Sequence, residues 1–424
     1  MPGMTEHDPT ARAYAVRLDR EDPLASFRER FVIDDPELVY LDGNSLGRLP
    51  LATRDRIERL TAQWGSELAA AWDSWLDAPA RVGDALAEAA LGARPGEAIA
   101  CDSTTVNLFK LASAALELAP PDVRAIVTDA GNFPTDRYVL DGLARARGLE
   151  LRLIEEDPID GPQPADIEDA CRAGDVALVS LSQVAYRSGA LADVEAINRA
   201  AAPARVLWDL SHSAGAVPVE LERRGVELAV GCTYKYLNAG PGAPAYLYTR
   251  EALQPQLDNP IQGWFGQREQ FEMGRAYDPV PGVKRFLGGT PPIAGLLAVE
   301  EGVRITGEAG IDALYAKSRA LTGLIVDLHD AWLAPLGFKL GSPREAERRG
   351  GHVSLRHSDA WPITRALIER AKVIPDFRGP DSIRLGPAPL YTRFTDVHDA
   401  LDRLRSLVED GAHREVDASR RAVT

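Results

Sequence analysis

Short apolar runs alternate with amphipathic segments along the middle of the chain. Segments such as 104–119 and 164–174 space their apolar residues at the period of a helix, whereas the runs between them are short and rich in β-branched residues. These runs are the predicted strands: 98–102, 123–129, 149–156, 176–182, 205–211, 228–234 and 243–249. Strands that alternate with helices predict an α/β fold, with a mostly parallel sheet and helices on both faces. Because these runs are mainly apolar, both faces of the sheet are expected to be buried.

The regions on either side have different patterns. Residues 51–92 place apolar positions at helical period, and so does the stretch 291–333, where Gly307 and Gly310 are expected to interrupt the helix. Residues 334–410 mix strand-like and helix-like segments, which predicts a smaller α+β domain. We therefore expect an N-terminal arm (1–50), a large α/β domain (51–305) and a small C-terminal α+β domain (306–424).

The charge balance narrows the possible partners. The net charge is −15, and a protein that binds nucleic acid or an anionic membrane needs a basic face, so neither partner is expected. No apolar run is long enough to span a bilayer, and the polar N-terminus differs from a signal peptide, which favours a cytoplasmic location. Cys101, Cys171 and Cys232 have neither the spacing of a disulfide framework nor that of a metal site, and no metal is expected.

Asp209 and Lys235 each stand at the end of a predicted strand. Ligands of open α/β sheets bind beyond the carboxyl ends of the strands, so both are candidate site residues. Taken alone, Asp209 is about as well explained as a helix cap, and Lys235 as a solvated turn residue. Together they meet two needs of pyridoxal 5′-phosphate (PLP): a carboxylate beside its pyridinium nitrogen, and an amine that forms a Schiff base with its aldehyde.

Two further segments complete the pattern of a PLP site. Ser103, Thr104 and Thr105 lie between a predicted strand and a predicted helix, where free N–H groups and hydroxyls suit a phosphate, although an ordinary N-cap is the commoner use of such residues. Phe133 could stack on the pyridine ring and Asp136 could bond its edge, although a loop with a buried Phe also explains that segment. The joint order of phosphate site, stacking loop, carboxylate and lysine predicts a PLP enzyme.

Longer motifs extend over most of the chain. They are LDGNSLG (41–47), DSTTVNLFKL (102–111), NFPTDRY (132–138), WDLSHSAGAVPVEL (208–221), GCTYKYLNAGPGAPAY (231–246), GWFG (263–266), RFLGGTPPI (285–293) and IRLGPAPLY (383–391). The sequence resembles the bacterial kynureninases, PLP enzymes of the class V aminotransferase group. YKYLNAGPG together with GWFG is the most specific part of this resemblance.

The resemblance implies a PLP-dependent transferase fold of type I, with PLP in the large domain. Lys235 would form the Schiff base and move the substrate Cα proton, while Tyr234 would relay a proton. Asp209 would pair with the pyridinium, with His212 beside it. The other implied cofactor contacts are Phe133, Thr135 and Asp136 at the ring, and Thr104, Thr105, Ser182 and Tyr234 around the phosphate.

The same resemblance implies a small-molecule substrate. Arg384 would bind its α-carboxylate through a bidentate fork, with Asn44 and Ser45 nearby on a substrate loop of the arm. Trp264 and Thr290 would approach the cofactor from the partner subunit of a homodimer. The implied reaction is the hydrolysis of L-kynurenine to anthranilate and L-alanine in tryptophan degradation.

Two positions depart from the family pattern. Gln267 stands where His is often expected, and Thr290 stands where vertebrate members carry Asn. Both are expected near the aromatic end of the substrate, which leaves activity on 3-hydroxy-L-kynurenine open. Thr290 favours the unsubstituted ring.

Three other functions share parts of this pattern. A cysteine desulfurase needs a nucleophilic cysteine late in the chain, and no cysteine follows Cys232. A simple aminotransferase would use the same Asp209 and Lys235, and would show turnover that depends on a keto acid. A PLP-binding sensor without catalysis would also hold the cofactor, but the presence of every expected residue type argues against it.

Overall fold

The computed structural model describes residues 8–417 and is built around a seven-stranded sheet with the order β2-β8-β7-β6-β5-β3-β4. Its strands are β2 (Ala98–Ala100), β3 (Ala125–Asp129), β4 (Glu150–Ile154), β5 (Val176–Ser182), β6 (Arg205–Asp209), β7 (Leu228–Gly231) and β8 (Tyr246–Thr249). Within this sheet β8 is antiparallel to both of its neighbours, and the other pairs are parallel. Each predicted run contains one of these strands, so the prediction of a mostly parallel sheet is confirmed.

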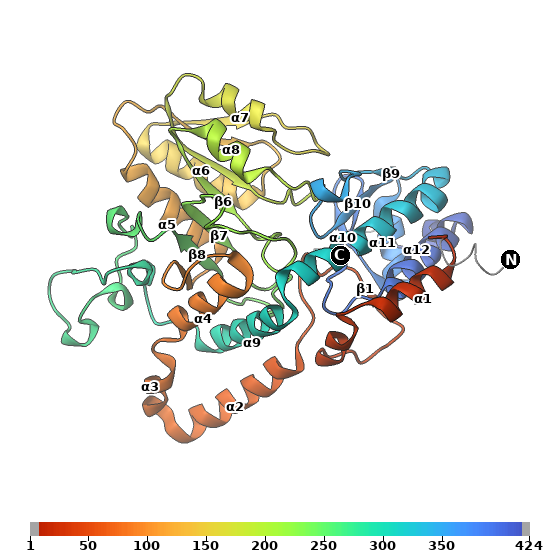
Figure 1. Ribbon diagram of the computed structural model, residues 1–424, viewed down its shortest axis with the longest axis horizontal. Coiled ribbons are helices and arrows are strands. Elements are labelled where there is room, and N and C mark those ends of the chain that lie inside the picture. Colours follow the sequence, from red (N-terminus) through yellow and green to blue (C-terminus); the bar gives the residue numbers. More distant parts are fainter. Residues whose placement is uncertain (1–7, 418–424) are drawn as a thin grey trace.

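Helices cover both faces of this sheet (Figure 1). One face packs against α5 (Thr104–Glu117) and α6 (Pro134–Arg147), and the other against α4 (Ala78–Leu86), α7 (Pro164–Cys171), α8 (Val194–Ala201) and α9 (Ile293–Ala309). In β6, Val206 and Trp208 join the core of the second set, whereas Leu207 joins the core of the first. Successive strand side chains point to opposite faces, which is why a strand buried on both faces is apolar throughout.

A smaller antiparallel sheet, β12-β13-β10-β9, forms a second core. Its strands are β9 (Lys339–Leu340), β10 (Val353–Arg356), β12 (Asp376–Arg378) and β13 (Ser382–Leu385), and the helices of this part are α10 (Ile311–Leu328), α11 (Ala360–Arg370) and α12 (Phe394–Glu409). The N-terminal segment packs here: α1 (Arg12–Glu21) lies along α12, and β1 (Val39–Tyr40) pairs in parallel with β11 (Val373–Ile374). The chain then enters the 42–47 segment, which reaches the end of the large sheet.

The helical stretch after Pro292 breaks once. α9 runs through Gly307 and ends at Gly310, whose φ of +78° suits glycine, and α10 begins at Ile311. The expectation that Gly307 also interrupts the helix was wrong. A Cβ at Gly307 would lie 3.2 Å from the side chain of Ala89, so glycine allows close packing there. The helix continues through Gly307 although glycine is about 1 kcal/mol less favourable than alanine inside a helix.

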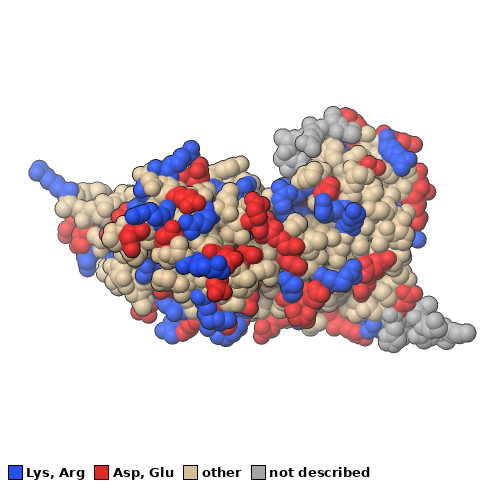
Figure 2. Space-filling view, turned by 90° about the horizontal axis from the view of Figure 1, so that it is seen from above, with Lys and Arg blue, Asp and Glu red and all other residues tan. Residues whose placement is uncertain are grey.

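Two segments project from the body, at the lower and left edges of Figure 1. One is α2 (Leu51–Glu67) with α3 (Trp72–Trp75), and the other is the irregular stretch between β8 and α9. They carry Trp64 and Phe271, each 65% exposed. None of the helices within residues 8–417 is long and apolar enough to cross a membrane. Acidic and basic side chains are interspersed over the face in Figure 2, so its described part lacks the broad basic patch that binds a phosphate backbone.

Candidate functional site

A cavity of about 480 Å³ opens at the carboxyl ends of the central strands. Its walls come from the residues that follow β3, β5, β6 and β7 and from the first turn of α5. This is where an open α/β sheet binds ligands, and the volume lies in the range of small-molecule sites. Ten of the predicted site residues line it: Thr104, Thr105, Phe133, Thr135, Asp136, Ser182, Asp209, His212, Tyr234 and Lys235.

Lys235 and His212 meet inside this cavity. The Lys235 Nζ lies 2.8 Å from His212 Nε2, and both side chains are buried. Burial lowers the pKa of Lys235, and burial together with the neighbouring Lys235 lowers the pKa of His212 well below its ordinary value. The site therefore favours a neutral imidazole and eases deprotonation of the lysine, as an amine that attacks an aldehyde requires.

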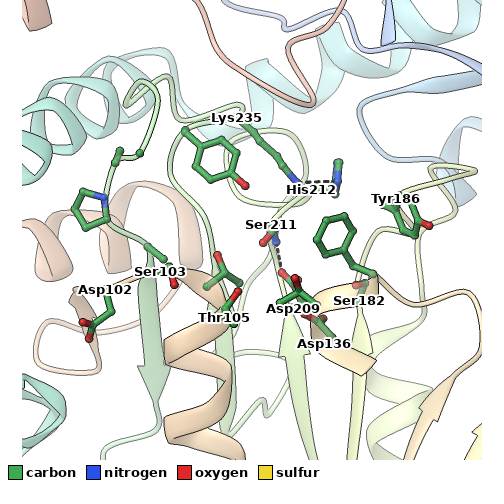
Figure 3. A pocket seen from close by; sticks show the side chains of 18 of the residues that line it. Asp102, Ser103, Thr105, Asp136, Ser182, Tyr186, Asp209, Ser211, His212 and Lys235 are labelled. Atoms are coloured by element: carbon green, nitrogen blue, oxygen red, sulfur yellow. Dashed lines mark hydrogen bonds between the residues drawn. The ribbon is translucent and has the colours of Figure 1, made fainter. Parts of the chain in front are cut away.

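Opposite the lysine, Asp209 and Asp136 lie side by side (Figure 3). The Asp209 carboxylate accepts a hydrogen bond from the backbone N–H of Ser211 at 2.7 Å. Neither carboxylate oxygen of Asp136 has a hydrogen-bond partner among the described residues. Burial, followed by the proximity of Asp209, raises the pKa of Asp136 well above its ordinary value. A buried pair of carboxyl groups, in which both oxygens of Asp136 lack a donor, fits a cationic N–H group such as a pyridinium.

The first turn of α5 closes the other end of the cavity. Ser103 caps this helix, since its side chain accepts a hydrogen bond from the N–H of Val106, so the N-cap explanation holds for Ser103. Thr104 and Thr105 follow as the first two helical residues and line the cavity. The first N–H groups of a helix have no partner within the helix, which makes this end of the cavity suitable for a phosphate.

The 42–47 segment forms a direct hydrogen bond to the turn after β7 that carries Lys235. The Gly47 N–H donates a 2.8 Å hydrogen bond to the carbonyl oxygen of Tyr234. Glycine is required because a Cβ at position 47 would lie 2.4 Å from the carbonyl oxygen of Lys235. Asn44 is fully buried on this segment, and neither polar atom of its amide has a partner among the described residues. Ser45 Oγ accepts a 3.3 Å hydrogen bond from Nη2 of Arg384.

Trp264 and Thr290 are separate from this cavity. Both lie on the stretch between β8 and α9, neither lines the cavity, and both side chains are exposed, Trp264 by 39%. Within one chain the structure therefore does not bring these two predicted residues to the others. A metal site is also lacking: within residues 8–417 no three His, Cys, Asp or Glu side chains are placed to hold an ion.

Several neighbours of the site have no strong sequence signal. Tyr186 packs edge-on against Phe133 at 5.3 Å between ring centroids, and His352 lies 5.4 Å from the ring of His212. Asp376 forms a buried ion pair with Arg384. Tyr186 could have been suspected because it follows a strand end by four residues. Asp376 lies on β12 of the smaller sheet and His352 directly precedes β10, and only the tertiary fold brings them here.

Comparison with known proteins gives one consistent result. A family model described as "Kynureninase C-terminal domain" matches residues 314–404. A kynureninase of Pseudomonas fluorescens is 41% identical over 410 residues, covering 94% of this chain and 96% of the relative. A kynureninase of Burkholderia pseudomallei (strain 1106a) is 41% identical over 424 residues, covering 97% of this chain and 99% of the relative.

Solved structures agree on the fold. The apo structure of a cysteine desulfurase from Thermococcus onnurineus NA1 matches with a TM-score of 0.74 at 18% identity, covering 93% of this chain and 98% of that one. The cystine C–S lyase C-DES in complex with cysteine persulfide matches with a TM-score of 0.75 at 19% identity, covering 87% of this chain and 98% of that one. The predicted fold type I of the PLP enzymes is thereby confirmed.

Proposed function

The chain belongs to the kynureninase family, and from this premise we propose that it uses PLP to hydrolyse L-kynurenine to anthranilate and L-alanine in tryptophan degradation. One observation carries the proposal: a single strand-end cavity holds the buried Lys235 and His212 on one side and the carboxyl pair of Asp136 and Asp209 on the other. That arrangement supplies both ends of the PLP ring with the groups they need.

The cavity would hold the cofactor in one orientation. Asp209, supported by Asp136, would bind the pyridinium, and Phe133 would cover the ring. The phosphate would lie at the first turn of α5. The full set proposed to hold PLP is Thr104, Thr105, Phe133, Thr135, Asp136, Ser182, Asp209, His212, Tyr234 and Lys235, joined by Trp264 and Thr290 of a second subunit. When bound, PLP supplies an electron sink for charge that develops at the substrate Cα.

Lys235 and Tyr234 would move the protons. Lys235 would remove the Cα proton, because the buried amine next to the neutral His212 loses its own proton more readily than an exposed lysine. The neighbouring Cys232, followed by burial, raises the pKa of Tyr234, so its phenol stays protonated near neutral pH. A protonated phenol beside Lys235 is suited to return a proton to the substrate.

Arg384 would bind the substrate α-carboxylate. Its Nε and one Nη2 hydrogen already bond Asp376. The opposite edge, formed by Nη1 and Nη2, faces the carbonyl oxygen of Tyr186 and the hydroxyl of Ser45. Nη1 and Nη2 donate to these two acceptors, and a substrate carboxylate would replace them in a two-point contact with this edge. Ser45 and the unpaired amide of Asn44 would help to orient the substrate.

A homodimer would complete the site. The exposed apolar side chains of Trp64, Leu68, Phe271 and Met273 gather on the two projecting segments, as expected of a surface that a second copy covers. The projecting stretch also carries Trp264 and Thr290, which would then reach the cavity of the partner. We further infer an arm (1–50), a large PLP-binding domain (51–305) and a small domain (306–424). Three free, buried cysteines support a cytoplasmic location.

The similarity in fold to cysteine desulfurases does not favour desulfurase activity for this chain. Their identity to this chain is 17–18%, a likeness that shows the fold alone. Desulfurase chemistry needs a mobile cysteine, whereas Cys101, Cys171 and Cys232 are all buried, and burial raises the pKa of each thiol.

Turnover of L-kynurenine tests the proposal. The PLP-loaded protein should release anthranilate, followed by its fluorescence, and an equal amount of alanine without any added keto acid. Parallel assays with 3-hydroxy-L-kynurenine report the ring preference. Absence of both products, or turnover that requires a keto acid, would overturn the proposed reaction.

A further inference from the structure

Arg384 sits in a buried charge network that extends beyond the residues assigned so far. Its side chain is 1% exposed and pairs with Asp376, which lies directly opposite it in the β12–β13 register. Arg378 also approaches Asp376, with its Nε 3.3 Å from the same carboxylate oxygen. Two guanidinium groups thus share one carboxylate, which leaves an excess positive charge next to the cavity.

Asp42 is the second carboxylate of this network. Its backbone forms a bridge to Gly386, two residues after Arg384, and Gly43 N–H donates a 3.0 Å hydrogen bond to the carbonyl oxygen of Gly386. These contacts hold Asp42 beside the arginines on the segment that also carries Asn44 and Ser45. The Oδ1 atom of Asp42 is buried and has no hydrogen-bond partner among the described residues. The ionised form of Asp42 is destabilised, because a buried carboxylate oxygen without a hydrogen-bond donor has lost its solvation by water.

We propose that Asp42 is a second counter-ion of the buried cluster of Arg384, Arg378 and Asp376, that it competes with the α-carboxylate of the substrate, and that binding of a carboxylate makes Asp42 take up a proton. The proposal rests on the function proposed above for Arg384. It makes Asp42 a positioning residue, which acts on the substrate through the charge of the arginine. A second anion brought close to an ionised Asp42 would meet like-charge repulsion, and protonation of Asp42 removes it.

The surroundings of Asp42 support a titration near neutral pH. Burial, followed by Asp376, raises the pKa of Asp42 to about 6, while Ser45, Arg384 and Arg378 oppose the rise. Other ionisable groups lie near Asp42 or Arg384. They are Arg48, whose guanidinium lies over the rings of Tyr40 and Tyr391; Lys235, with a lowered pKa; Tyr40, Tyr236 and Tyr391, each with a raised pKa; and His212 and His352, each with a lowered pKa. The three tyrosines and the two histidines stay neutral near neutral pH, so Asp42 rather than any of these five groups changes charge there.

The affinity of the site for a carboxylate should fall as the pH rises. Below about pH 6 Asp42 carries a proton, the network keeps its excess positive charge, and a carboxylate should bind most tightly. Above that pH the ionised Asp42 neutralises the excess. Affinity for a carboxylate should then fall by about 10-fold or more by about pH 8, the size expected for two like charges that lie close together in a partly buried site.

Calorimetric binding of 4-oxo-4-phenylbutanoate to the holoenzyme tests this inference. The compound has a carboxylate and an aromatic ketone but no amino group, so it neither titrates in this range nor joins the cofactor. Titrations at about pH 5.5, 7 and 8, each in two buffers of different ionisation enthalpy, give the affinity and the number of protons taken up. Wild type should bind at least about 10-fold more weakly at the highest pH, and should take up a fraction of one proton near pH 7.

Asp42→Asn keeps the shape of the side chain and removes its charge, so it should bind with an affinity that is independent of pH and without proton uptake. Asp327→Asn is the matched control, because burial also raises the pKa of Asp327, which lies on α10 outside the network. It should keep the wild-type pH profile. If Asp42→Asn does not fold, proton uptake by the wild type remains the test.

Flat affinity in the wild type, or an unchanged pH profile in Asp42→Asn, would overturn the inference. These results are distinct from a failure of the proposed function, which would appear as a lack of kynurenine turnover in an enzyme that still binds the keto acid.

Discussion

At Gly47 the 42–47 segment contacts the turn that carries Lys235. Gly47→Ala therefore tests whether this contact is needed for activity and stability. A Cβ there would lie 2.4 Å from both the carbonyl oxygen of Lys235 and Oδ1 of Asn238. Because the first of these atoms belongs to the backbone, a side-chain rotation cannot relieve the clash. The turn is held by the 3.0 Å hydrogen bond from Asn238 N–H to the Lys235 carbonyl, so the 42–47 segment must move outward.

Two contributions set the loss of stability in Gly47→Ala. Overpacking costs about 1–3 kcal/mol, and loss of the Gly47–Tyr234 hydrogen bond costs about 1 kcal/mol, so Gly47→Ala should destabilise the protein by about 2–4 kcal/mol. The movement displaces Asn44 and Ser45 from the substrate. A misplacement of about 1 Å lowers kcat/KM for L-kynurenine by about 100-fold.

Steady-state kinetics and urea denaturation of the PLP-loaded protein measure both effects. Gly142→Ala is the matched control, because it replaces a glycine inside α6 whose Cβ would meet nothing within 4 Å. It should leave kcat/KM unchanged and raise stability by up to about 1 kcal/mol, the difference in helix propensity. A Gly47→Ala enzyme within twofold of wild-type kcat/KM would refute the role assigned to this contact.

Three further predictions concern charged groups. Arg384→Lys should raise KM for L-kynurenine by about 10-fold or more with a smaller change in kcat, since lysine cannot form the two-point contact, and an unchanged KM would remove Arg384 from the site. Lys317 forms a 2.7 Å buried ion pair with Asp22, so Asp22→Asn should cost about 3–5 kcal/mol in urea denaturation, whereas adding Lys317→Met should recover most of it. A cost below about 1 kcal/mol for Asp22→Asn alone would contradict this account. Burial, followed by the proximity of Glu156, raises the pKa of Asp129 from 3.8 to about 7. Because the folded state keeps this proton while the unfolded state loses it, the stability of the apoprotein should fall by up to about 4 kcal/mol between about pH 4 and pH 7. Asp129→Asn should remove this pH dependence of stability, and an unchanged dependence would contradict the assignment.

The sequence predicts the central fold and cavity well because both follow from local patterns. The strands of the large sheet other than β4 are almost entirely buried on both faces and therefore read as apolar runs, whereas the edge strand β4 exposes Glu150 and Leu153. A parallel sheet brings the ends of such runs to one edge. Asp209 is the last residue of β6, and Phe133 and Lys235 each follow the end of a strand by four residues, so their convergence follows from the topology.

Other features depend on contacts between distant segments. Asp376 meets Arg384 through an antiparallel register, and His352 reaches His212 from the other sheet. Neither contact has a periodic or spacing signal. The position of Trp264 and Thr290 outside the cavity of their own chain has no spacing signal either, and the assignment of both residues to a partner subunit came from the family resemblance alone.

Borohydride reduction of the PLP-loaded protein, followed by peptide mapping, tests the central claim most directly. Reduction fixes PLP to the amine that holds it, and the chain has six lysines, at positions 110, 235, 284, 317, 339 and 372. The account predicts one phosphopyridoxyl label per chain, on Lys235, with loss of kynurenine turnover in proportion to labelling. A label on any other lysine, or full turnover after complete labelling of Lys235, would contradict it.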